Sequence, residues 1–122
     1  MWREGIEKEV FHPQFHGREH LNVKKWMKTL REGHQSTRMA FDLGSFGLTS
    51  AVDPTLKNNY MGAFNSGLEE DIQNYKCILR EGLELFEKIF DYRSESFIAT
   101  TYTWNPKIEF FLKKYGVKYL QG

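Results

Sequence analysis

Residues 96–120 have the sequence SFIATTYTWNPKIEFFLKKYGVKYL, and this stretch decides the fold class. Its first part, Ser96–Tyr102, is rich in β-branched and aromatic residues, which predicts a strand. Asn105 predicts a helix cap with Pro106 in the first helical position, and Gly116 ends that helix. A second strand starts directly after the glycine. Strand, helix and strand in this order form a βαβ unit, so part of the sheet is parallel and the fold class is α/β.

Two further helices are predicted upstream of this unit. From about Leu68 to Asp91, apolar residues recur at alternating spacings of three and four, and acidic residues fill the first turn. A shorter helix starts near Asn22, which can cap it, and runs to about Glu32, where Gly33 is a natural stop. The chain is therefore expected to be helix-rich.

The remaining segments give weaker patterns. Residues 1–10 are typical of a short helix or a helix end. Residues 11–16 contain alternating phenylalanines that suit a strand, and Pro13 favours a sheet edge or a strand start because proline lacks an N–H donor. Between residues 34 and 67, several glycines and Asp53-Pro54 mark turns, so short helical turns are expected there.

Composition excludes several classes of protein. The chain has 122 residues, 17 Lys and Arg against 16 Asp and Glu, and 40% hydrophobic residues, which predicts a soluble globular chain of one domain. A net charge of +1 gives no reason to expect a nucleic-acid partner. No apolar run is long enough for a membrane span, and the charged start of the chain is no signal peptide. The single cysteine, Cys77, rules out an internal disulfide, and the chain is therefore predicted to be cytoplasmic. Cys77 is expected to be buried in a helix.

The densest polar cluster is HPQFHGREH, residues 12–20. If residues 12–16 are extended, His16 and His20 flank a glycine turn at the carboxyl end of a strand. Two imidazoles at this spacing can share one Zn²⁺ ion. Arg18 and Glu19 lie between them and are available to contact a substrate or to support the metal-binding histidines. The alternative is a pair of solvated or hydrogen-bonded loop histidines. The spacing fixes no third ligand; Asp42 and Asp53 are candidates because they are predicted to lie in loops.

Tyr102 and Trp104 are candidate substrate-binding residues. They lie near the carboxyl end of a predicted parallel strand, the edge at which α/β sheets bind ligands, and their rings can stack on a sugar. The alternative is that both rings cover the core, as aromatic side chains commonly do.

The string PQFHGREHLNV, residues 13–23, resembles the second motif of the polysaccharide deacetylase (NodB-homology) family, in a divergent bacterial branch. That motif is a strand that ends in HxxxH and precedes a helix. The order of elements after residue 96 is also similar. The resemblance implies a partial (β/α) barrel, a divalent metal held by two histidines and an aspartate, and hydrolysis of an acetyl group on a polysaccharide.

Residue by residue, the resemblance transfers only to His16 and His20, as the two metal-binding histidines. The family's aspartate-rich first motif would lie before residue 1, and its general-acid histidine beyond residue 122. The family's arginine-proline motif is replaced by residues 99–104, ATTYTW, with Pro106 following.

We therefore expect residues 1–122 to be a single domain, or a fragment of a larger metal-dependent carbohydrate deacetylase-like protein, with little activity alone. Catalytic residues are not identified, the expected cofactor is a divalent metal such as Zn²⁺, and the expected partner is a carbohydrate. Exposed strand edges predict a possible homo-oligomer. The alternative function is a non-catalytic module of the same fold that binds a carbohydrate or a protein.

Overall fold

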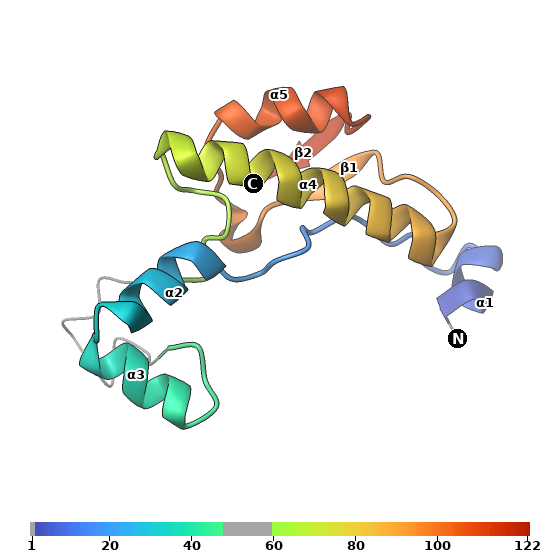
Figure 1. The fold of residues 1–122 in the computed structure, drawn as a ribbon. Coiled ribbons are helices and arrows are strands. Elements are labelled where there is room, and N and C mark those ends of the chain that lie inside the picture. The colour runs from blue at the N-terminus through green and yellow to red at the C-terminus, as the bar shows by residue number, and fades with distance from the viewer. Residues whose placement is uncertain (1, 48–59) are drawn as a thin grey trace.

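The structure is a computed structural model that describes residues 2–47 and 60–122. In chain order the helices are α1 (Trp2–Glu7), α2 (Val23–Arg31), α3 (Gln35–Asp42), α4 (Glu69–Phe90) and α5 (Lys107–Lys114), and the strands are β1 (Ser96–Ile98) and β2 (Tyr119–Gln121). Figure 1 shows α4 and α5 beside the strands, with α2 and α3 forming a separate projection. Within these two ranges, no helix is long and apolar enough to cross a membrane.

The sheet is parallel, as the βαβ pattern predicts. Phe97 of β1 is in register with Leu120 of β2. On the other side of β1, Phe15 forms an isolated parallel bridge with Phe97, and the Ile98 N–H donates to the Phe15 carbonyl at 3.0 Å. The order across the sheet, Phe15, β1, β2, is therefore the order along the chain. The predicted helix-rich α/β class with a few parallel strands is confirmed.

The core lies between the sheet and helices α4 and α5. Helices α4 and α5 pack against each other, and both contribute side chains to one cluster with Phe15 and Phe97. The predicted stripe of α4 lines this core: Ile72, Tyr75, Leu79, Leu83 and Phe86 are all buried. This burial explains why the alternating spacing of three and four predicted the helix correctly.

The first predicted strand is shorter than expected. It ends at Ile98 because the chain turns at Thr100–Tyr102, where Thr101 and Tyr102 have φ values of 59° and 55°. Left-handed backbone cannot continue an extended strand. The β-branched composition hid this turn, in which the buried Thr100 hydroxyl accepts a hydrogen bond from the Ala63 N–H at 3.1 Å.

The predicted cap of α2 and the glycine stops of α2 and α5 are confirmed, whereas α5 starts at Lys107, with Pro106 at the cap position and Asn105 one residue before it. The Asn22 side chain accepts from the Lys25 N–H, and Asn105 accepts from the Lys107 N–H, both at 3.0 Å. Gly33 and Gly116 follow their helices with φ values of 74° and 94°. Left-handed backbone of this kind is the usual reason for glycine at a helix end.

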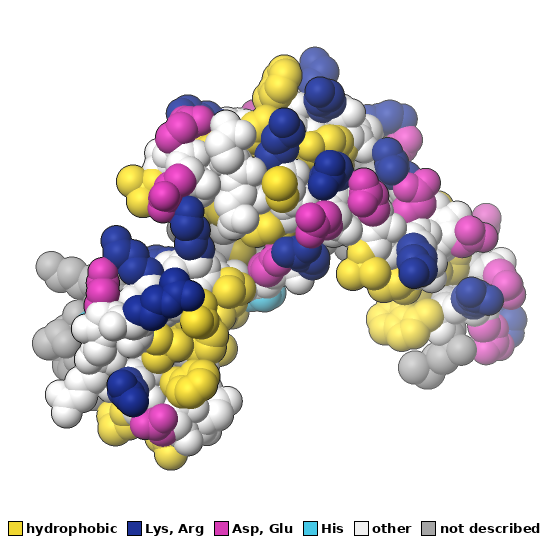
Figure 2. All heavy atoms as spheres, in the orientation of Figure 1, with side chains coloured by type: hydrophobic (Ala, Val, Ile, Leu, Met, Phe, Trp, Pro, Cys, Tyr) yellow, Lys and Arg dark blue, Asp and Glu magenta, His cyan; other side chains and the backbone are white. Residues whose placement is uncertain are grey.

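Between residues 34 and 47 the structure contains one short helix, α3, which agrees with the expected short helical turns; Asp53 and Pro54 lie outside the described residues. One other expectation is corrected. Cys77 is exposed, because it lies on the solvent side of α4 rather than in its apolar stripe. The apolar side of α2 is only partly covered: Val23 is 45% exposed and Trp26, Met27 and Leu30 are half-buried. Hydrophobic side chains gather over α2 and α3 in Figure 2.

Gly82 lets α4 approach the first sheet segment closely. A Cβ atom added at this position would lie 2.8 Å from Cζ of Phe15 and 3.1 Å from Cβ of Arg18. The Phe15 ring is buried and cannot move away freely. Glycine has a low helix propensity, and α4 contains it at a point where the helix backbone passes close to Phe15.

Substituting Gly82→Ala is expected to destabilise the protein, although alanine favours the helix by about 1 kcal/mol. Overpacking against Phe15 costs roughly 1–3 kcal/mol, which exceeds that gain. Urea unfolding measures the difference. The control is Asn74→Ala at an exposed position of the same helix, which should be neutral or slightly stabilising; a stabilised Gly82→Ala variant would contradict the close packing.

Candidate functional site

The candidate site begins where Phe15 leaves the sheet. The Phe15 ring packs against Phe86 of α4 and Phe97 of β1, with ring centroids 6.2 and 5.7 Å apart. The buried Ser94 hydroxyl accepts the Phe15 N–H at 3.1 Å and donates to the Ser96 carbonyl at 2.8 Å. Ring packing and hydrogen bonds thus fix Phe15, which directly precedes His16 at the carboxyl end of a parallel segment.

Ser94→Ala is expected to lower the free energy of unfolding by about 1–3 kcal/mol, because the buried Phe15 N–H loses its acceptor. Ser96→Ala, at a partly buried position two residues away, is the matched control and should change stability by less. Denaturant unfolding of the two variants checks this. Equal stabilities would show that Ser94 does not anchor the segment.

A glycine turn follows His16. Gly17 has a φ of 100°, and a Cβ there would lie 2.8 Å from the buried Phe64 ring, so both conformation and space favour glycine. The turn brings His16 and His20 together: their ring centroids are 5.1 Å apart, the planes are inclined by 50°, and both side chains are exposed. The predicted pairing of these two histidines at a turn is therefore present.

The separation of the two rings fits a shared metal ion. Zn–N bonds of about 2.0–2.1 Å and tetrahedral angles place the centres of two bound imidazoles roughly 5 Å apart. The 5.1 Å between the centroids of His16 and His20 matches this separation. In the part of the chain that the structure describes, no group of three His, Cys, Asp or Glu side chains forms a complete site. Asp42 does not join the pair, and Asp53 lies outside the described residues.

Arg18 contacts both Glu19 and helix α4. The Arg18 Nε donates to Glu19 Oε1 at 2.6 Å, and the guanidinium also pairs with Glu81. The hydrogen bond to Glu19 is the main cause that raises the pKa of Arg18 above its usual value. Glu19 is only 18% exposed in its side chain. These contacts hold the loop between the two histidines against α4, a role that the sequence spacing did not suggest.

Tyr102 and Trp104 follow β1 and differ in their surroundings. Tyr102 is 70% exposed. Trp104 is half-buried against the core, its indole N–H donates to Glu109 Oε1 at 3.0 Å, and its ring lies beside Gly122. The core-covering interpretation therefore describes Trp104, whereas Tyr102 presents its ring to solvent.

Ala63 and Phe64 connect the two parts of this edge. The Phe64 ring contacts Gly17 and packs at 5.5 Å from the Phe97 ring, and the Phe64 carbonyl accepts the Asn105 N–H at 2.8 Å. Sequence reasoning missed Phe64, which is fully buried. Its segment has no hydrophobic periodicity, and the nearby glycines at 62 and 67 indicated only a turn.

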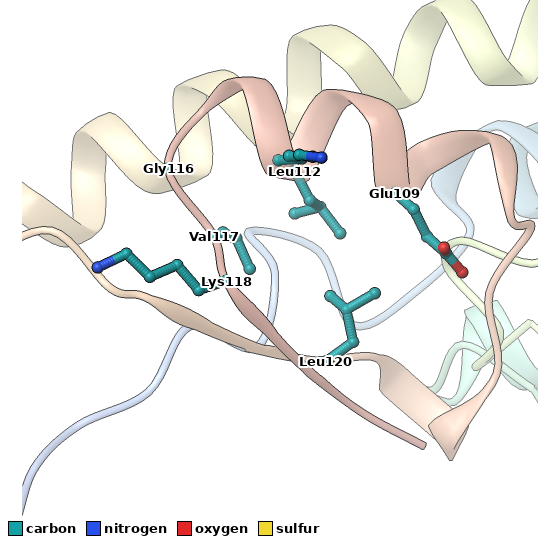
Figure 3. A pocket seen from close by; sticks show the side chains of 7 residues that line it. Glu109, Leu112, Gly116, Val117, Lys118 and Leu120 are labelled. Carbon is teal, nitrogen blue, oxygen red and sulfur yellow. The ribbon is translucent and has the colours of Figure 1, made fainter.

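A hollow lies at the edge of the sheet opposite to the histidine pair. It has a volume of about 570 Å³ and is bounded by α5 and β2, with Leu112, Val117 and Leu120 among its lining residues (Figure 3). Because β2 is separated from Phe15 by β1, this hollow is distinct from the histidine pair.

No protein-family model matches the chain, and the comparisons with curated proteins and with solved structures find no match either.

Proposed function

We propose that the chain belongs to a metal-dependent carbohydrate deacetylase-like hydrolase, which removes N- or O-acetyl groups from a polysaccharide, and that His16 and His20 hold its divalent metal, Zn²⁺. The observation that carries the proposal is the pair of exposed imidazoles, with ring centroids 5.1 Å apart, at the carboxyl end of a parallel sheet segment. Catalytic groups of parallel α/β enzymes gather at this edge.

The sheet order supports the same proposal. Phe15, β1 and β2 follow one another in chain order, all parallel, and the intervening helices α4 and α5 pack together. A (β/α) barrel is built by repeating this unit, so a partial barrel of the polysaccharide deacetylase type is the architecture we propose.

The residues at this edge have separate tasks in the proposed function. His16 and His20 would hold the metal, which, when bound, supplies a Lewis acid and lowers the pKa of a water ligand. Arg18 and Glu19 keep the loop between the histidines against α4. Tyr102 offers an exposed ring on which a sugar can stack.

Calorimetric titration of the chain with Zn²⁺ tests the metal site. We expect the His16→Ala/His20→Ala variant to bind Zn²⁺ at least about tenfold more weakly, since it loses both imidazole ligands. The matched control is His12→Ala/His34→Ala, which removes the other two histidines and should leave binding unchanged. Equal affinities of the wild-type chain and the His16→Ala/His20→Ala variant would refute the metal site.

The second candidate function is a non-catalytic carbohydrate-binding module, which the exposed Tyr102 ring favours. It predicts that N-acetylated oligosaccharides bind without metal and that Tyr102→Ala weakens this binding roughly tenfold, because a stacked ring is lost. Phe110→Ala, at an equally exposed aromatic residue on α5, is the control. Binding that requires both Zn²⁺ and the two histidines would instead favour the hydrolase.

A further inference from the structure

Helix α2 separates its charges from its apolar residues. Four cations lie within one third of the circumference of this helix: Lys24, Lys25, Lys28 and Arg31. With 3.6 residues per turn, these four positions fall within one arc of the helix surface. The apolar stripe that starts at Val23 occupies the opposite side. Figure 2 shows Lys and Arg side chains gathered over α2. One face of the helix is therefore strongly cationic.

This cationic face borders a hollow of about 480 Å³. The opposite wall comes from the segment that enters α4, and it includes Asn65, Ser66 and Leu68. Leu68 is 62% exposed. The volume lies within the range of small-molecule sites, and the walls combine an apolar side chain with polar groups and positive charge.

The two acidic residues of the hollow, Glu70 and Asp71, both pair with the same lysine. Lys24 Nζ lies 2.9 Å from Glu70 and 3.4 Å from Asp71, and these contacts, the Glu70 hydrogen bond first, raise the pKa of Lys24. Asp71 also accepts a hydrogen bond from the Ser66 hydroxyl at 2.5 Å. Lys24 thus joins α2 to the start of α4. The four Lys and Arg side chains that line the hollow outnumber its two carboxylates, so its net charge is positive.

Lys28 and Arg31, the two cations nearest the end of α2, have few ion-pair partners among the described residues. Arg31 forms no ion pair with any residue in the ranges 2–47 and 60–122, and Lys28 reaches only Glu32, at 3.9 Å on the exposed helix surface. Such exposed pairs are weak. Lys28 and Arg31 are three residues apart and so project from the same side of the helix.

We propose that this hollow binds a phosphate-bearing small molecule. Arg31 and Lys28 contact the phosphate, because a guanidinium fork binds two phosphate oxygens together and an ammonium group adds a compact charge. Asn65, Ser66 and Leu68 contact the rest of the molecule. A confined hollow with few cations suits one phosphate group rather than a nucleic-acid backbone, which needs an extended basic surface. This site does not depend on the metal proposed above.

Titration of the ¹⁵N-labelled chain with inorganic phosphate, and separately with glucose 6-phosphate, tests the proposal by NMR. Saturable shift changes are expected at the amides of Lys28, Arg31, Asn65 and Ser66. Tighter binding of glucose 6-phosphate assigns the site to an organic phosphate, and equal affinities assign it to free phosphate. The absence of any saturable change in the hollow with either ligand would overturn the proposal.

A charge-matched pair of variants separates a site from a general charge effect. Lys28→Gln/Arg31→Gln is expected to weaken binding at least about tenfold, because both phosphate contacts are lost. Lys113→Gln/Lys114→Gln on α5 removes the same number of charges and should leave the affinity within about twofold. Thermal unfolding verifies that both variants are folded. An equal loss of affinity in both variants would overturn the assignment of the site to this hollow.

Discussion

The pairing of Phe15 with β1 is the contact on which the rest of the structure depends. One residue from the first part of the chain bridges to Phe97, and the Ile98 N–H and the Ser94 hydroxyl complete its backbone hydrogen bonds. Buried backbone groups must be paired, so this contact fixes the position of the segment along the sheet. It also joins residues about 80 positions apart in sequence, so that α2, α3 and α4 all lie in the connection between two parallel segments.

This single contact also determines where the polar groups lie. Because Phe15 is held in the core, His16 leaves the sheet at its carboxyl edge, and the Gly17 turn brings His20 beside it. Gly82 lets α4 approach closely enough for Arg18 to reach Glu81. The candidate metal pair is thus positioned by packing and backbone hydrogen bonds that include neither imidazole.

Much of the fold could be predicted from the sequence, because the signals are local. Asn22 caps α2, the Asn105 side chain accepts a backbone N–H at the start of α5, Gly33 and Gly116 end these helices, and most of the stripe of α4 is buried as its spacing indicates. The early end of β1 could not be predicted, because the left-handed backbone at Thr101 has no signature in residue type. The burial of Phe64 and the contact of Arg18 with Glu81 depend on residues far away in sequence. Long-range packing of this kind is invisible to periodicity. The resemblance to the polysaccharide deacetylase family stays a prediction.

The central claim is that the sheet edge positions two imidazoles for one metal ion. X-ray absorption spectroscopy at the zinc edge, on the chain loaded with one equivalent of Zn²⁺, tests it directly. The account predicts multiple scattering from two imidazole rings, with Zn–N distances of about 2.0–2.1 Å. A ligand sphere of oxygen atoms without imidazole scattering would contradict it.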